Sequence, residues 1–279
     1  MQVLVTGATG NVGRAALDAL VARGVPAVAA VRPGSAADLP TPTVPLDFAD
    51  PATWPAALDG VDRLFLLRPP AISDVGPTLN ALVDAAADQL EHVVFLSVAG
   101  AEKNAVIPHA KVEAHLRAGP VPWTFLRAGF FAQNLCGPYR ADIRDDDRIY
   151  VPAGRQPVSW VDTRDLGEAA AAAFLRDDAR GAAWLLTGPE ARTFADVAAS
   201  LTRHLGRPIR YVPASIVGYL RHLRGQGLPW GPALVYTVLH TAIRFGAEAR
   251  VDPTLGDVLG RRPRTIDDTI RDHLDLWQR

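Results

Sequence analysis

The feature that most constrains the fold of this chain is a glycine-rich turn close to its start. Val3-Leu4-Val5 is a short, uninterrupted apolar run, which is typical of a parallel strand covered on both faces. Glycines follow at positions 7, 10 and 13, and from Val12 onward apolar residues recur at helical spacing. The pattern predicts a strand, a tight turn and a helix that ends at Gly24, where a residue free to adopt positive φ is preferred.

A turn of this kind forms an anion-binding site. The free backbone N–H groups of the first helical turn and the positive end of the helix dipole point to the same place. Gly7 allows the turn, Gly10 lets a pyrophosphate approach the backbone, and Gly13 lets helix and strand pack closely. An ordinary glycine-rich loop is the alternative, but glycines that directly follow a strand and open a helix favour a dinucleotide site. We therefore expect cofactor contacts from Gly7, Thr9, Gly10, Asn11 and Val12.

Downstream of this turn, apolar runs alternate with helical segments. Expected strands cover residues 27–31, 43–46, 62–67, 93–96, 123–126, 158–161, 184–187 and 210–212. Expected helices cover residues 51–58, 74–89, 108–116, 162–175, 193–205, 213–224, 230–246 and 265–277. Alternating units with short connections predict an α/β fold with a doubly wound parallel Rossmann sheet, in which Pro45 places its strand near an edge. We interpret the acidic run 145–147 as a solvated turn and residues 250–264 as a surface loop.

Two positions at the ends of expected strands bear on the cofactor. Arg32 ends the second strand, where an acidic residue would bind the ribose of NAD and an arginine accommodates the 2′-phosphate of NADP. Asp38, the nearest acid, lies beyond a Pro-Gly-Ser turn, so Arg32 favours NADP(H), with a solvated loop arginine as the alternative. Leu67 and Arg68 end the fourth strand at the carboxyl edge of the sheet, where ligands bind in open α/β sheets.

The form Thr-Gly-x-x-Gly-x-x-Gly resembles the fingerprint of the short-chain dehydrogenase/reductase superfamily, particularly its extended and atypical members. That superfamily has a serine after strand five and a Tyr-x-x-x-Lys pair on the next helix. Ser97 matches the serine, but Ile107 stands four residues before Lys111 and the first tyrosine of the chain is Tyr139. The usual triad is therefore absent. The resemblance also implies that the pair Asp47-Phe48 lies against adenine, although Asp47 could equally cap the next helix.

Further motifs narrow this resemblance to the NmrA-like branch of the atypical short-chain dehydrogenases. They are Phe95-Leu96-Ser97; His109-x-Lys111-x-Glu113-x-x-Leu116; Trp123-Thr124-Phe125-Leu126-Arg127 with Phe130-Phe131 and Asn134; and Ser159-Trp160-Val161-Asp162 with Asp165-Leu166. The resemblance implies an NAD(P)-binding core, here residues 1–128 and 156–187. It also implies a smaller, mostly helical portion that closes the substrate cleft, here residues 129–155 and 188–279.

Lys111 and Ser97 are the candidate catalytic and cofactor-contacting residues of this core. An ammonium beside a nicotinamide ring can act as general acid, so Lys111 is the candidate proton donor. The alternative is a surface lysine paired with Glu113 or its neighbours. Ser97 orients substrate or cofactor, or simply caps the end of its strand. His109 and His115 are six residues apart, which does not suit a metal pair, and we expect them to be exposed or locally hydrogen-bonded.

Substrate contacts are expected after strand six. Phe130 and Phe131 offer aromatic packing and Asn134 an amide hydrogen bond, with Trp160 on the same wall. The alternative is that Phe130, Phe131 and Asn134 belong to the core, which is at least as good an account of Phe131. Most of the aromatic residues and His240 between positions 213 and 246 are interpreted as core packing, with a substrate pocket or a partner-facing helix as alternatives. No metal ligands converge in the sequence.

Composition excludes several other classes of protein. A net charge of −1 gives no basic field for nucleic acid, and Cys136, the only cysteine, allows no disulfide framework. No signal peptide or long apolar run is evident, so we expect a cytoplasmic monomer or homodimer without membrane contact. The predicted function is NADPH-dependent reduction of a small aromatic or conjugated carbonyl or quinone substrate. An NADP-binding regulator without turnover and a non-redox isomerase or dehydratase remain alternatives.

Overall fold

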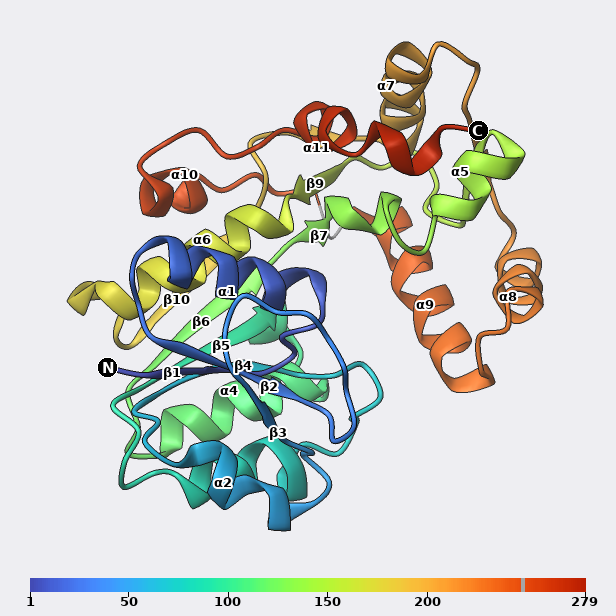
Figure 1. Ribbon diagram of the computed structural model, residues 1–279. Helices are drawn as coiled ribbons and strands as arrows, with labels where there is room; N and C mark the ends of the chain where they lie inside the picture. Colours follow the sequence, from blue (N-terminus) through green and yellow to red (C-terminus); the bar gives the residue numbers. More distant parts are fainter. Residues whose placement is uncertain (247–248) are drawn as a thin grey trace. The chain divides into compact units, whose positions relative to one another are not determined.

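The computed structural model describes residues 1–246 and 249–279 (Figure 1). Its largest sheet has seven strands in the order β10-β6-β5-β4-β1-β2-β3, and every neighbouring pair is parallel. The strands are β1 (Val3–Val5), β2 (Ala27–Val31), β3 (Thr43–Pro45), β4 (Arg63–Leu67), β5 (His92–Val98), β6 (Trp123–Ala128) and β10 (Ala182–Leu186). The strand order reverses between β1 and β4, which is the switch point of a doubly wound sheet. The predicted Rossmann fold is confirmed.

Helices cover both faces of this sheet. They are α1 (Asn11–Ala22), α2 (Trp54–Leu58), α3 (Ala81–Ala85), α4 (Pro108–Ala118), α6 (Thr163–Leu175) and α10 (Thr254–Leu259), with short turns η1 (Pro51–Thr53), η2 (Gly76–Asn80), η3 (Ala101–Lys103) and η5 (Asp177–Ala179). Figure 1 shows α1 and α6 on one face and α2 and α4 on the other. A Cβ on Gly167 would lie 2.3 Å from the carbonyl carbon of Ala15, so α1 and α6 meet at backbone contact.

The sheet follows the burial that the sequence suggested. β1 is fully buried, and β5 is buried over six of its seven residues, as expected for central strands with both faces covered. β3 pairs only with β2 and ends in Pro45, which confirms its place at the edge. The helix expected over residues 74–89 is instead the π-turn η2, where the Asn80 N–H donates to the Val75 carbonyl (2.9 Å), followed by the short helix α3.

A second group of elements forms smaller sheets and helices. The strands are β7 (Phe130–Phe131), β8 (Arg148–Val151), β9 (Val158–Val161), β11 (Ala191–Arg192) and β12 (Arg210–Pro213), arranged as β11-β9-β7 and β12-β8. The helices are α5 (Arg140–Asp146), α7 (Phe194–Leu205), α8 (Ile216–Gly225), α9 (Trp230–Ala242) and α11 (Ile266–Asp272), with short turns η4 (Ala132–Leu135), η6 (Ile243–Phe245) and η7 (Leu274–Trp277). Aromatic and aliphatic side chains of these elements share one core.

Two sequence interpretations are wrong in these regions. Asp145 and Asp146 end α5 and only Asp147 has the left-handed conformation of a turn, with φ +54°. Ion pairs from Arg144 and Arg148 stabilise the carboxylates at this helix end. The expected loop over residues 250–264 contains α10, where Leu255 is completely buried.

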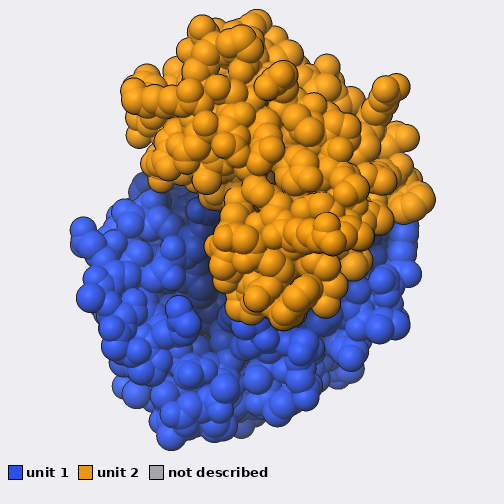
Figure 2. Space-filling view, turned by 90° about the vertical axis from the view of Figure 1, so that its right-hand side faces the viewer, with its two compact units in different colours: residues 1–128, 163–186, 254–261 blue, residues 129–162, 187–253, 262–279 orange. Residues whose placement is uncertain are grey.

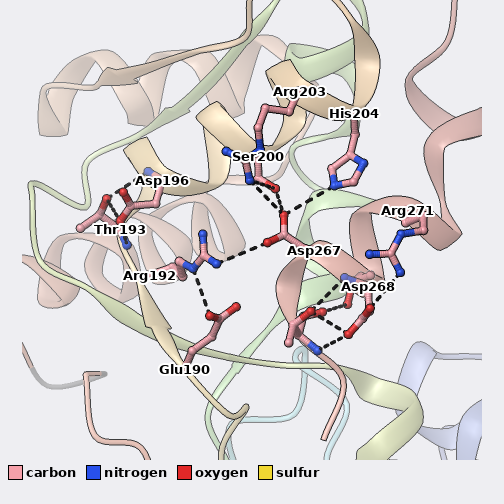
Figure 3. A network of polar contacts seen from close by, with 12 residues as sticks. Glu190, Arg192, Thr193, Asp196, Ser200, Arg203, His204, Asp267, Asp268 and Arg271 are labelled. Carbon is pink, nitrogen blue, oxygen red and sulfur yellow. Dashed lines mark hydrogen bonds and ion pairs between the residues drawn. The ribbon is translucent and has the colours of Figure 1, made fainter.

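Helix α7 is tied to α11 by a polar network around Asp267 (Figure 3). The Asp267 carboxylate accepts a hydrogen bond from the Ser200 hydroxyl and lies within 3.3 Å of an Arg192 nitrogen and 3.4 Å of an Arg203 nitrogen. Both helices also begin with a capping box, Thr193 with Asp196 and Thr265 with Asp268. His204 Nε2 also lies 3.6 Å from this carboxylate, so four side chains share one acceptor.

The chain divides into two compact units (Figure 2). The first contains residues 1–128, 163–186 and 254–261, and the second contains residues 129–162, 187–253 and 262–279. Residues 156–162 lie in the second unit, because β9 pairs there with β7 and β11. Residues 254–261 lie in the first, because α10 packs on α6 and β10. Within the described ranges, no helix has the length and apolarity needed to cross a bilayer.

Candidate cofactor and active site

The glycine turn after β1 is a tight cradle of backbone atoms. Gly7 has φ +61°, and a Cβ there would meet a methyl group of Leu67 at 2.9 Å. The Gly10 N–H closes the turn on the Gly7 carbonyl (2.9 Å). A Cβ on Gly13 would lie only 2.1 Å from the same carbonyl oxygen. Side chains are therefore excluded at Gly7 and Gly13, for the conformational and packing reasons that the spacing suggested.

Helix α1 opens from this turn with unpaired donors. Its N-cap is Gly10, which provides no side-chain cap. The N–H groups of the first turn therefore have no capping side chain as hydrogen-bond acceptor. Thr9, Gly10 and Asn11 are exposed, whereas the Val12 side chain is buried, so only the backbone of Val12 is available to a ligand. The cradle and the uncapped helix fit the diphosphate of a dinucleotide.

Arg32 lies exposed just beyond the end of β2. Its guanidinium makes no ion pair or hydrogen bond with another described residue, so it is available to an anion. Arg14 in α1, which the sequence analysis did not consider, donates to the Asp38 carbonyl (3.1 Å) and pairs with Asp18 (3.1 Å). Arg14 thus fastens the loop that follows Arg32 to the helix of the glycine turn. An arginine directly after the third glycine was the available signal.

Asp47 and Phe48 follow β3. The Asp47 carboxylate accepts from the Ala49 N–H (2.8 Å), while Asp50 caps the next helical turn through the Ala52 N–H (3.1 Å). The alternative that Asp47 caps this helix is therefore wrong. Phe48 is only 6% exposed and belongs to the core on the α2 side of the sheet, which leaves little of its side chain for an adenine contact.

A threonine that sequence reasoning missed joins the ends of β1 and β4. The Thr6 hydroxyl donates to the Phe65 carbonyl (3.0 Å) and accepts from the Leu67 N–H (2.8 Å). It thereby fixes Leu67 against Gly7. The threonine of the fingerprint was visible in the sequence, but its function required the neighbouring strand to be known.

Arg68 and His109 meet beyond the end of β4. The Arg68 Nε–H donates to His109 Nε2 over 3.4 Å, and the Arg68 guanidinium also donates to the Pro69 carbonyl (3.1 Å). Burial, helped by the charge of Arg68, lowers the pKa of His109 to about 4, although Glu113 acts in the opposite direction. His109 is therefore a neutral, half-buried imidazole. It is neither exposed nor locally hydrogen-bonded as expected, because its partner Arg68 lies 41 residues away in the sequence.

Glu113 of α4 is the centre of a buried network. Its carboxylate accepts the Ser97 hydroxyl (2.6 Å), two nitrogens of Arg127 (3.0 and 2.7 Å) and one of Arg117 (2.9 Å). Burial raises the pKa of Glu113, but the hydrogen bonds from Arg127 and Ser97 outweigh it and hold the pKa below its usual value. Because an ionised carboxylate only accepts, the proton of Ser97 is committed to Glu113, and Ser97 is itself 1% exposed.

Lys111 lies on a different face of α4. Its side chain is exposed and has no partner among the residues that the structure describes. Residues two positions apart in a helix are separated by about 200° around its axis. Lys111 therefore points away from Glu113. Lys111 is a surface lysine, as the alternative interpretation held. The pairing with Glu113 that this alternative included is wrong, because Arg117, Arg127 and Ser97 occupy the carboxylate. His115, on this outer side, pairs with Asp84 (2.7 Å).

The expected substrate residues lie in the second unit. Trp160 is 1% exposed, with its indole N–H donated to the Arg192 carbonyl (3.1 Å). Phe130 packs edge to face on Trp160, Phe194 and His240, with ring centroids 5.0 to 6.0 Å apart. Trp160 is thus a core residue, and its expected place on a substrate wall is wrong. Phe131 and Asn134 are partly exposed. No three potential metal ligands converge within residues 1–246 and 249–279.

Comparison with known proteins agrees with this architecture. Residues 1–267 match the NmrA-like family. An NAD(P)H azoreductase from Xenophilus azovorans is 31% identical over 280 residues, which cover 97% of each chain. Quinone oxidoreductase 2 from Escherichia coli is 25% identical over 280 residues, 96% of this chain and 97% of the relative. The solved structure of the Escherichia coli quinone oxidoreductase with NADPH has a TM-score of 0.86 at 24% identity and covers 99% of this chain and 100% of its own. The chain therefore belongs to the NmrA-like family.

Proposed function

We propose that this protein is an NADPH-dependent reductase of small aromatic or conjugated acceptors, such as quinones, conjugated carbonyl compounds or azo compounds. The observation that carries the proposal is the cradle of Gly7 and Gly13 at the uncapped start of α1. The names of an azoreductase and a quinone oxidoreductase among the relatives support the chemistry. When bound, the nicotinamide would supply the hydride.

The cofactor contacts proposed for this chain all come from the first unit. The first turn of α1 would hold the diphosphate, with Thr9 and Asn11 exposed beside it. Arg32 would bind the 2′-phosphate through its free guanidinium, on a loop that Arg14 holds in place. Asp47 and Leu67 would line the edge between these points.

Calorimetric titration with NADPH and with NADH tests which nucleotide the protein binds. We expect NADPH to bind at least tenfold more tightly, and Arg32→Ala to abolish this preference through loss of about 1.4 kcal/mol of phosphate binding. Arg23→Ala is the matched control, because Arg23 is an exposed arginine at the other end of α1. Absence of binding to either nucleotide would refute the proposal. An unchanged preference in Arg32→Ala would refute only the assignment of Arg32.

NADPH oxidation with a panel of quinones, enones and azo dyes tests the reaction. The rival function is a nucleotide-sensing regulator without turnover, and the burial of Ser97 against Glu113 favours it, because that serine cannot donate to a substrate. Tight NADPH binding without oxidation in any reaction would support the regulator. A product formed without NADPH would support a non-redox enzyme. We also propose that the protein is cytoplasmic and is a monomer or a homodimer. Light scattering at assay concentration distinguishes the monomer from the homodimer.

A further inference from the structure

Helix α4 carries a second candidate, besides Lys111, for the residue that contacts the substrate during reduction. Val112 and Leu116 are buried and define the face of α4 that packs on the sheet. His109 and Glu113 lie on the same side, since residues three and four apart share a helical face. The spacing of four residues between them is that of the absent Tyr-x-x-x-Lys pair, whereas Lys111 is on the outer face.

The position of His109 is fixed from two sides. Its ring packs against Phe95 of β5, with centroids 6.1 Å apart, and Arg68 approaches from the end of β4. Glu113 fastens the next turn of the helix to Ser97 of β5 and Arg127 of β6. The imidazole is therefore held beside the carboxyl ends of β4 and β5, which is the edge where ligands bind in open α/β sheets.

The Arg68 contact also decides which nitrogen of His109 carries the proton. A guanidinium only donates, so Nε2 accepts from Arg68 Nε. A neutral imidazole with an accepting Nε2 has its proton on Nδ1. No described residue accepts from this N–H, and Nδ1 is not among the buried atoms left unpaired. The structure thus offers one free, uncharged donor at the edge of the sheet.

We propose that His109, rather than Lys111, donates a hydrogen bond from Nδ1 to the acceptor heteroatom that becomes negative during reduction, and that Glu113 is a positioning residue for it. This inference rests on the proposed reductase function. The proton of Nδ1 stays on the imidazole, and water supplies the proton that completes the reduction. A neutral donor stabilises developing negative charge without first losing a proton to solvent.

The first test measures the imidazole directly. Nitrogen and carbon NMR of histidine-labelled protein reports the tautomer and titration of each ring. We expect His109 to be the Nδ1–H tautomer at pH 7 and to titrate near the pKa of about 4 that its burial produces. The His109→Gln spectrum assigns the signal. An Nε2–H tautomer, or titration near the ordinary value, would overturn the proposal whether or not NADPH binds.

The second test measures turnover and cofactor affinity. We expect His109→Leu to lower kcat about 100-fold, the usual effect of removing one such donor, with the NADPH Kd within twofold of wild type. His109→Gln, which keeps an N–H donor, should recover part of this loss, and His115→Gln on the outer face is the control that should leave kcat unchanged. Lys111→Ala should retain more than a tenth of kcat.

Two outcomes would contradict this assignment. One is a loss of kcat in Lys111→Ala that exceeds the loss in both His109 variants. The other is wild-type kcat in His109→Gln and His109→Leu. If the wild-type protein binds NADPH but reduces no acceptor, the proposed function fails, and the NMR result still decides the state of His109. Glu113→Gln should shift the His109 signals and lower kcat without changing KM.

Discussion

Replacing Gly13 by alanine is the sharpest test of the cradle. The new Cβ would stand 2.1 Å from the Gly7 oxygen and 2.6 Å from its carbonyl carbon, where real Cβ atoms stay beyond 3.0 Å. Both neighbours are backbone atoms, so the turn itself has to move by about 1 Å. Overpacking of this kind costs about 1–3 kcal/mol, offset by at most about 1 kcal/mol from the better helix propensity of alanine.

Calorimetric titration with NADPH and urea unfolding measure the two consequences of Gly13→Ala. We expect the free energy of unfolding to fall by about 1–2 kcal/mol and the Kd for NADPH to rise roughly 10- to 100-fold, since every 1.4 kcal/mol is tenfold. Gly24→Ala is the matched control. Gly24 has φ +67° with no atom near its Cβ position, so alanine there costs about 1–2 kcal/mol in backbone strain at the far end of α1. A Gly13→Ala protein that binds NADPH within twofold of wild type would refute the reasoning.

Two further predictions concern stability. Burial lowers the pKa of His240 to about 4, from 6.5 in the unfolded chain, so the unfolded state takes up the proton first and stability is lost as pH falls from 6.5 to 4. This loss is up to about 3 kcal/mol, and His240→Gln should lose less over the same window in urea unfolding, whereas an equal loss would contradict the prediction. Asp267→Ala removes the acceptor of the Ser200 hydroxyl and one of the two carboxylates that pair with Arg192, which keeps Glu190. It should lower the melting temperature by several degrees, equivalent to about 1–3 kcal/mol. Asp275→Ala, at an exposed position, should leave it unchanged, and equal effects of the two substitutions would argue against the network.

The order of strands and helices in the parallel sheet could be predicted because burial leaves a clear period in the sequence. Continuous apolar runs mark β1 and β5, and Pro45 marks the edge strand. Helix α10 was not predicted, because a segment of six residues is too short to show a helical period. Glycine and proline around it are typical of a loop, while the decisive feature, the burial of Leu255, depends on tertiary packing.

The candidate site likewise has one part that the sequence predicts and another that depends on tertiary packing. The glycine turn is local, so the sequence contains nearly all of its geometry. Glu113 was a member of the family motif and a candidate surface partner of Lys111, and it was given no role in the core, because the network that buries it comes from Ser97 and Arg127 on two strands. The buried face of α4, set by Val112 and Leu116, was the available signal. Following that face by three and four residues leads to His109 and Glu113.

The interleaving of the two units along the chain limits how such a protein can diversify. The polypeptide passes from one unit to the other after residues 128, 162, 186, 253 and 261. Exchange of one half for that of a relative would therefore need five simultaneous joints, where a protein with consecutive domains needs one. Gene recombination is therefore an inefficient way to exchange one unit of this architecture. New substrate preferences in this architecture have to arise by point substitution within an inherited pair of halves.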